Sequence, residues 1–205
     1  MNKKLNTDKK KVNIVIDGKK IQIKKGSTLM QAAKKVGIHI PALCYHEKIK
    51  PHGACRLCIV EIERKGKSKI VASCAFPVEE GLIVHTESSK VEQIRKNLVE
   101  LYMALFSFNP EIKRLAKKYE LASTRYKKEY NYCILCGLCV RYCEEVKKNN
   151  AIGFVGRGIN KKVVFIPESA YFKKCKDCME CMDICPTGVF PSNYGIERIP
   201  QVSES

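Results

Sequence analysis

The chain has 205 residues, of which 45% are hydrophobic, and a formal net charge of +17. This length allows two small domains but excludes one large catalytic body. The charged residues 1–11 lack the apolar core of a secretory signal, and no apolar stretch approaches the length of a membrane span, so we expect a cytoplasmic protein with no membrane span.

After this basic arm, the chain shows the pattern of a hairpin followed by a helix. Two alternating apolar segments flank the turn dipeptide Asp17-Gly18 and predict paired strands within residues 12–23. Residues 28–36 have an apolar helical face, and either Ser27 or Thr28 can cap that helix.

A long loop and three further strands follow. The loop runs from Cys44 to Cys58 and contains proline and glycine, which disfavour regular structure. The strands are predicted at residues 58–63, 69–74 and 81–86. A hairpin, a helix, a long loop and further strands together describe a β-grasp domain over residues 12–86.

Residues 87–130 change character and predict a helical linker. Ser89 and Glu92 have the spacing of a capping box, and apolar residues recur at helical spacing after them. Asn109 and Pro110 are expected to end this helix and to start another one, as its N-cap and first residue. We expect the apolar faces of both helices to pack between the flanking domains rather than to form a partner-binding groove.

Residues 131–190 contain the internal repeat of the chain, a compact cysteine run that occurs twice. Between the two runs, residues 151–157 and 163–166 predict a hairpin around the turn that contains Gly158. Residues 191–205 are polar and contain proline, so we expect a tail that packs on a partner or stays loose.

The twelve cysteines fall into three sets of four, and none is left over. The first set has the spacing C-x10-C-x2-C-x15-C, and the other two share the spacing C-x2-C-x2-C-x3-C. Four thiolates are what an iron–sulfur cluster requires. The sets are Cys44, Cys55, Cys58 and Cys74; Cys133, Cys136, Cys139 and Cys143; and Cys175, Cys178, Cys181 and Cys185.

Two other uses of paired cysteines are less compatible with this pattern. Disulfide frameworks belong to small secreted chains, and this sequence has no secretory signal. Zinc sites use C-x2-C pairs, but they usually combine two such pairs. Each compact run instead has a third cysteine three residues further on and then a fourth cysteine, which in the second run precedes Pro186. This pattern favours a cubane cluster over zinc.

The spacing assigns a [2Fe–2S] cluster to the first set and two [4Fe–4S] clusters to the others. A long loop with a distant fourth ligand can wrap the edge of a flat [2Fe–2S] rhomb, and Gly53 and Ala54 allow close backbone approach to it. The x10 gap departs from the C-x4-C-x2-C spacing of plant-type ferredoxins. In two-cluster ferredoxins the fourth cysteine of each run binds the other cluster. The predicted [4Fe–4S] ligands are Cys133, Cys136, Cys139 and Cys185 for one cluster, and Cys143, Cys175, Cys178 and Cys181 for the other.

The predicted fold class is therefore α+β. An N-terminal β-grasp [2Fe–2S] ferredoxin domain is followed by a helical linker and a C-terminal bacterial-type 2[4Fe–4S] ferredoxin domain. Iron would be bound through the cysteines alone, and no set of catalytic residues or dinucleotide fingerprint is present in the sequence.

Several segments carry a family resemblance. Residues 53–61 and the spacing of the first cysteine set resemble the N-terminal iron–sulfur module of the large iron–sulfur subunit of complex I. Residues 136–146 and 151–158, completed by the Cys185-Pro186-Thr187-Gly188 segment, resemble the ferredoxin domain of the hydrogenases that share this module. The same module opens iron-only hydrogenases and the diaphorase iron–sulfur subunits of NAD-linked hydrogenases. The resemblance implies a further cluster bound by one His and three Cys, but no cysteine lies between Cys74 and Cys133, so that site is missing. We expect all four histidines (His39, His46, His52 and His85) to be structural or surface residues.

The resemblance implies an electron-relay subunit without a catalytic end. A flavoprotein subunit that oxidises or reduces NAD(P) would be one partner, and a hydrogenase, a formate dehydrogenase or a similar redox module would be the other. The alternative is a free, polyferredoxin-like carrier that moves between enzymes.

The strongly basic composition has three interpretations. Solvated lysine faces are the simplest, and steering of an acidic partner, such as an acidic ferredoxin or a neighbouring subunit, is the functional one. A redox-sensing regulator that binds nucleic acid is the third interpretation. We expect no nucleic-acid partner, because no arginine-rich or aromatic-interleaved recognition segment is present.

Overall fold

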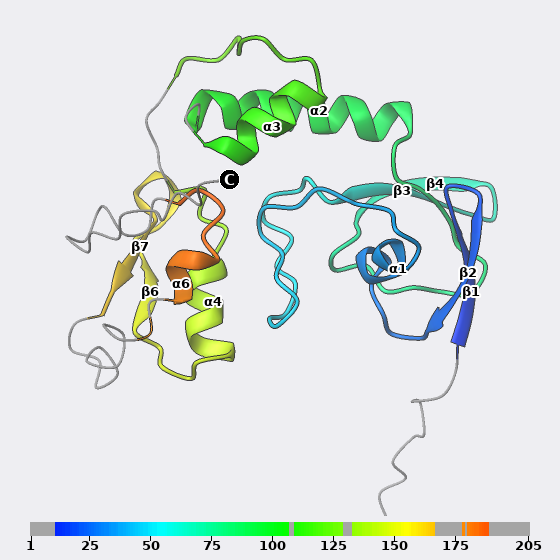
Figure 1. Ribbon diagram of the computed structural model, residues 1–205, viewed down its shortest axis with the longest axis horizontal. Coiled ribbons are helices and arrows are strands. Elements are labelled where there is room, and N and C mark those ends of the chain that lie inside the picture. Colours follow the sequence, from blue (N-terminus) through cyan, green and yellow to red (C-terminus); the bar gives the residue numbers. More distant parts are fainter. Residues whose placement is uncertain (1–10, 107–108, 129–132, 167–177, 179, 189–205) are drawn as a thin grey trace, which may run out of the picture.

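The computed structural model describes residues 11–106, 109–128, 133–166, 178 and 180–188. Residues 1–10 of the predicted basic arm, the predicted tail and Cys175 lie outside the described residues. The described part consists of a mixed sheet with one helix against it, two helices that follow the sheet, and a smaller group of short helices with a hairpin (Figure 1).

The larger sheet has five strands in the order β2-β1-β5-β3-β4. β1 and β5 run parallel, whereas the pairs β1–β2, β3–β5 and β3–β4 are antiparallel. The five predicted strands are present, with limits that differ by up to two residues from those expected. The strands are β1 (Lys11–Ile16), β2 (Lys19–Lys24), β3 (Ile59–Arg64), β4 (Lys67–Ala72) and β5 (Ile83–His85).

The predicted turn between β1 and β2 is present, and hydrogen bonds to a residue distant in sequence hold it in place. Asp17 and Gly18 both have left-handed backbone conformations, with φ of 46° and 79°, as a two-residue hairpin turn requires. The carboxylate of Asp17 accepts hydrogen bonds from the backbone N–H of Thr86 at 2.8 Å and from its hydroxyl at 2.6 Å. The hairpin is thereby tied to the end of β5.

Helix α1 (Leu29–Lys35) packs against the sheet. Thr28, rather than Ser27, is its N-cap, and it forms a capping box with Gln31. Leu29, with Ala32 and Ala33 of the same helix, belongs to the core cluster that the inward side chains of the sheet also enter. The long connection from α1 to β3 leaves this core and extends away from the sheet (Figure 1).

Two helices follow the sheet, α2 (Ser89–Leu105) and α3 (Pro110–Lys118). The predicted cap of α3 is confirmed, since the side-chain oxygen of Asn109 accepts from the N–H of Ile112 at 3.1 Å. The predicted capping box at the start of α2 is wrong by one residue. Ser88 caps the helix, because its hydroxyl accepts from the N–H of Val91 at 3.4 Å, and Ser89 is already helical.

The C-terminal group contains the predicted hairpin. Its strands pair antiparallel, and Gly156 in the connection has a φ of 70°. A Cβ at Gly156 would lie 2.4 Å from the carbonyl oxygen of Asn160, so the connection has no space for a side chain there. The elements are α4 (Leu138–Glu145), β6 (Ile152–Val155), the 3-10 turn η1 (Gly158–Asn160), β7 (Lys162–Phe165) and α6 (Glu180–Asp183).

A second core joins the sheet domain to the C-terminal group. Leu43 and Leu57 from the long loop pack with Val99 of α2, Ile112 of α3 and Leu138 of α4. The apolar faces of α2 and α3 therefore contact both flanking parts, as expected from their periodicity. Within the described residues, none of the helices is long and apolar enough to cross a bilayer.

Candidate metal centres

The first four cysteines meet at the inner end of the long loop. Cys44 and Cys55 lie in the loop, Cys58 lies immediately before β3, and Cys74 lies two residues after β4. Their exposed fractions are between 0% and 3%. The fold thus collects four buried thiols from two separate segments, which is the donor set that a shielded iron–sulfur cluster requires.

The four thiols form two pairs. The N–H of Cys55 donates to the sulfur of Cys44 at 3.3 Å, and the N–H of Leu43 donates to the sulfur of Cys55 at 3.3 Å. The sulfurs of Cys58 and Cys74 are 3.2 Å apart. Two thiols for each of two irons is the ligation of a [2Fe–2S] cluster, so the arrangement fits that group, and the N–H donors to sulfur would raise its reduction potential.

One thiol in each pair ionises readily. The hydrogen bond from Cys44 lowers the pKa of Cys55 to about 6, and the hydrogen bond from Cys74 lowers the pKa of Cys58 to about 7. The pKa values of the donors, Cys44 and Cys74, are raised for the same reason. Because iron binds the thiolate, each pair already contains one sulfur that is suited to binding it.

Two side chains of α2 hold the loop that carries these thiols. Arg95 is 1% exposed, and its guanidinium donates to the carbonyl oxygens of Leu57 at 3.0 Å and Ile59 at 2.6 Å, on either side of Cys58. The Tyr102 hydroxyl donates to the carbonyl oxygen of Cys55 at 3.0 Å. Neither residue was predicted from the sequence. For Arg95 a signal exists, because it occupies the apolar stripe of α2 four residues from valines on both sides.

Three cysteines of the first compact run lie together with Cys185. Cys136 and Cys139 are buried and Cys133 is exposed. Burial, followed by the nearby charges of the other thiols, raises the pKa of all three, and Cys185 contributes in each case. Cys185 therefore lies near the three cysteines of the first compact run, and Cys139 also lies near Cys181 of the second run.

The remaining described cysteines surround a small internal cavity. Cys143 of α4, Cys178 and Cys181 line it together with Tyr142 and Lys147. The N–H of Ala151 donates to the sulfur of Cys143 at 3.3 Å. The fourth predicted ligand, Cys175, is outside the described residues. The three described thiols of this predicted set therefore line one cavity.

The long loop lies against α4, so the two cysteine-rich regions are neighbours. Arg141 donates to the carbonyl oxygens of Lys50 and Cys44, the latter at 3.4 Å, and the carboxylate of Glu145 accepts from the N–H of Lys50 at 2.8 Å. Tyr102 lies between the sites. Its pKa is raised first by burial and then by the charges of Cys55, Cys44 and Cys136.

Two of the four histidines contact other elements of the fold, and the other two, His39 and His52, are exposed. His85 ends β5, and the ring of His46 packs edge-on against Tyr142 of α4 with ring centroids 5.3 Å apart. Among the described residues, His, Cys, Asp and Glu side chains nowhere gather in threes or more around a point where one metal ion could sit.

Comparison with known proteins agrees with this geometry. Residues 9–89 match the family described as "2Fe-2S iron-sulfur cluster binding domain", and residues 124–191 match "NADH-quinone oxidoreductase subunit 3, ferredoxin-like domain". A chain of an NAD+-reducing [NiFe]-hydrogenase, solved in the H2-reduced state, is 30% identical with a TM-score of 0.66. That match covers 75% of this chain and 74% of the hydrogenase chain.

The chain belongs to the iron–sulfur module family of complex I and NAD-linked hydrogenases. The resemblance inferred from the cysteine motifs is thus confirmed. A [2Fe–2S] ferredoxin domain and a [4Fe–4S] ferredoxin-like domain are present.

Several curated proteins of the family are similar over most of this chain. The 78 kDa subunit of NADH-ubiquinone oxidoreductase from Neurospora crassa is 32% identical over 88% of this chain and 27% of its own length. An NADH-quinone oxidoreductase subunit from Rickettsia typhi is 30% identical over 88% of this chain and 30% of its own length. The alpha subunit of NADPH-Fe(3+) oxidoreductase from Geobacter sulfurreducens is 32% identical over 88% and 24%. The chain spans less than a third of the length of these relatives.

Proposed function

We propose that this chain is an electron-transfer subunit. It relays electrons between a flavin-containing subunit that uses NAD(P)H and a hydrogenase, formate dehydrogenase or similar redox module. The names of its relatives support this function, since they are subunits of NADH-quinone and NADPH-Fe(3+) oxidoreductases and a chain of an NAD+-reducing hydrogenase.

The twelve cysteines are the proposed ligands, and bound clusters would supply one-electron redox chemistry. The [2Fe–2S] ligands are Cys44, Cys55, Cys58 and Cys74. The [4Fe–4S] ligands are Cys133, Cys136, Cys139 and Cys185 for one cluster, and Cys143, Cys175, Cys178 and Cys181 for the other.

One observation carries the proposal: thiols of different quartets share one buried core. Cys44 and Cys55 of the loop belong to the same apolar cluster as Cys136 of the first compact run. The side chain of Tyr102 packs against this cluster and donates to the carbonyl oxygen of Cys55. A dry, packed connection between two redox sites keeps water from them and holds their separation constant, which a relay requires.

Metal analysis and spectroscopy of anaerobically purified protein test the proposal. About ten iron atoms per chain are expected, two from the [2Fe–2S] cluster and four from each [4Fe–4S] cluster. Cys55→Ser should remove the [2Fe–2S] EPR signal and leave the [4Fe–4S] signals, because its sulfur lies in the first quartet. About two to four iron atoms together with zinc would refute the cluster assignment.

The native molecular mass distinguishes a fixed subunit from the free carrier considered above. A subunit should elute from a cell extract with a flavoprotein and a second redox protein. A lone peak at 23.3 kDa would contradict the subunit and favour the carrier.

A further inference from the structure

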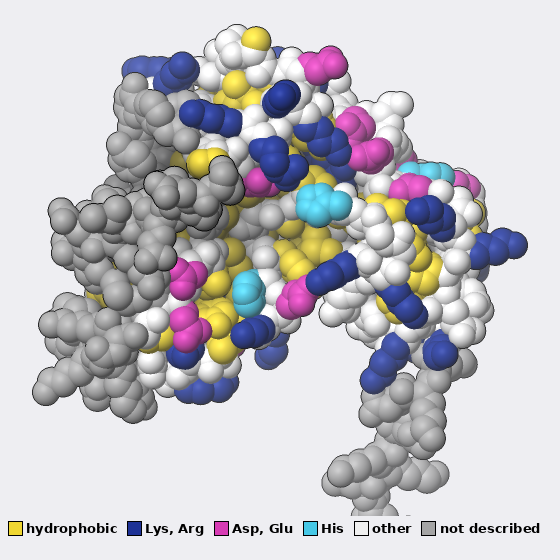
Figure 2. Space-filling view, in the orientation of Figure 1, with side chains coloured by type: hydrophobic (Ala, Val, Ile, Leu, Met, Phe, Trp, Pro, Cys, Tyr) yellow, Lys and Arg dark blue, Asp and Glu magenta, His cyan; other side chains and the backbone are white. Residues whose placement is uncertain are grey.

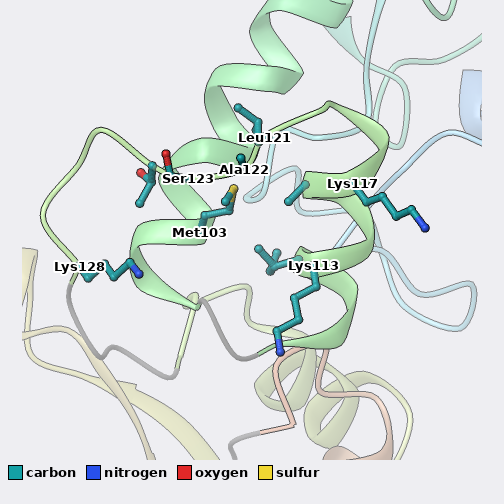
Figure 3. A pocket seen from close by; sticks show the side chains of 10 residues that line it. Met103, Lys113, Lys117, Leu121, Ala122, Ser123 and Lys128 are labelled. Atoms are coloured by element: carbon teal, nitrogen blue, oxygen red, sulfur yellow. The ribbon is translucent and has the colours of Figure 1, made fainter.

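A cavity of about 510 Å³ lies between α2, α3 and the segment that follows α3. Its apolar wall is formed by Met103 of α2, Ile112 and Ala116 of α3, and Leu121 of the segment that follows α3. In Figure 3, Met103 lies at the centre, with Leu121 and Ala122 above it. The packing expected of these helices is therefore incomplete, and a concave apolar surface remains.

Three lysines surround this apolar wall: Lys113, Lys117 and Lys128. In Figure 3, Lys113 and Lys128 extend from opposite sides of the cavity, and Lys117 points away from its centre. All three are exposed, and none of their ammonium groups forms an ion pair or a hydrogen bond with any described residue.

Three neighbouring cations on the same stretch of chain have carboxylate partners, whereas the exposed Lys127, next to Lys128, forms no ion pair with any described residue. Unneutralised positive charge therefore lies at the cavity and directly beside it. The paired neighbours are Arg114 with Glu111 at 2.6 Å, Lys118 with Glu87 at 2.8 Å, and Arg125 with Glu100 at 3.3 Å.

We propose that this cavity docks an acidic, amphipathic segment of a partner protein. An apolar side chain of that segment would fill the space against Met103 and Leu121, and its carboxylates would pair with Lys113 and Lys128. A simple anion would leave the apolar wall uncovered, and an apolar ligand would leave the lysines unpaired. The net charge of +17 adds long-range attraction for an acidic partner, and Figure 2 shows Lys and Arg side chains spread over the described part of the face in view.

The position of the cavity gives this docking a functional consequence. Asn109, the cap of α3, donates through its side chain to the carbonyl oxygen of Pro186 at 2.9 Å. Pro186 directly follows Cys185, a proposed ligand of the compact site. A partner seated on α3 would therefore lie beside the cysteine-rich C-terminal group. The inference rests on the proposed function only in expecting a redox partner there.

A binding experiment on the cluster-loaded full chain tests the proposal. The probe is a short fluorescent peptide in which leucine and phenylalanine are flanked by glutamates, and its affinity is measured by anisotropy at about 0.15 M salt to limit non-specific attraction. Lys113→Gln/Lys128→Gln should weaken binding about tenfold, the loss expected when two charge pairs are removed. Ala122→Glu should weaken it similarly, because Ala122 is exposed at the cavity and the new carboxylate repels the peptide.

The matched control is Lys67→Gln/Lys69→Gln, which removes two exposed lysines from β4 and should leave the affinity unchanged. Equal weakening by the control would show that general surface charge binds the peptide, and would overturn the proposal. So would absence of binding, or equal binding of a peptide whose leucine and phenylalanine are replaced by serine. Binding that emerges only after deletion of residues 191–205 would assign the cavity to the chain's own C-terminal segment and would also overturn it. Iron content measured on the same samples keeps this result separate from the cluster assignment.

Discussion

Arg95 is not a proposed ligand, but its substitution should weaken the retention of the [2Fe–2S] site. Its buried guanidinium donates to the carbonyl oxygens of Leu57 and Ile59, and thereby holds the backbone on both sides of Cys58. Arg95→Leu places an apolar side chain in the α2 stripe and removes both donors. The two buried carbonyls then lose these partners.

The expected cost follows from these two contacts. A hydrogen bond to a charged group contributes about 1.5–3 kcal/mol, so losing both costs about 3–6 kcal/mol. A small domain is stable by only about 5–15 kcal/mol, so this loss is a large part of the total. Arg95→Lys retains the charge but lacks the forked donor geometry, and should have an intermediate effect.

Anaerobic urea unfolding of the iron-loaded protein measures this cost. The [2Fe–2S] EPR signal of Arg95→Leu should be lost at a lower urea concentration than its [4Fe–4S] signals. The wild type should lose its signals at a higher urea concentration than the one at which Arg95→Leu loses its [2Fe–2S] signal. Lys96→Leu is the matched control, because Lys96 is the exposed neighbour on the same helix, and it should change stability by no more than about 0.5 kcal/mol. If Arg95→Leu unfolded at the midpoint of Lys96→Leu, the reasoning would be refuted.

Three smaller changes test individual contacts. Tyr102→Phe removes the bond to the Cys55 carbonyl and should cost about 1 kcal/mol in urea unfolding; an unchanged midpoint would show that this contact adds no stability. Asp17→Ala removes both bonds to Thr86 and should lower the melting temperature of the N-terminal domain; a melting temperature equal to that of the wild type would contradict this role. Gly156→Ala should be more destabilising than Gly158→Ala in thermal unfolding. Both glycines have positive φ, but only at Gly156 does the new Cβ meet backbone, so equal losses would contradict the argument.

Local chemistry was enough to predict much of the fold. The Asp17-Gly18 turn, the Asn109 cap and the C-terminal hairpin depend on contacts between residues close in sequence, and all three were predicted correctly. The start of α2 was misplaced by one residue because Ser88 and Ser89 are both competent caps, and the chain entering from β5 selects the first of them. The choice of Thr28 over Ser27 was likewise left open, and the capping box with Gln31 resolves it.

The sequence by itself determined the class of the protein. Cysteine spacing reflects the geometry of a cluster and the path of its loop, so it can be recognised in the sequence alone. It led to the family without coordinates. Tertiary structure decided what surrounds those thiols. Arg95 reaches carbonyls 36 and 38 residues away, and Tyr102 reaches Cys55 across 47 residues.

The lysine-lined cavity also exists only in the folded chain. Whether a lysine finds a carboxylate depends on which helix packs beside it, so Lys118 is paired by Glu87 while Lys113 on the same helix remains unpaired among the described residues. Spacing therefore specified how the cysteines are grouped, and packing specified how those thiols are shielded, connected and approached.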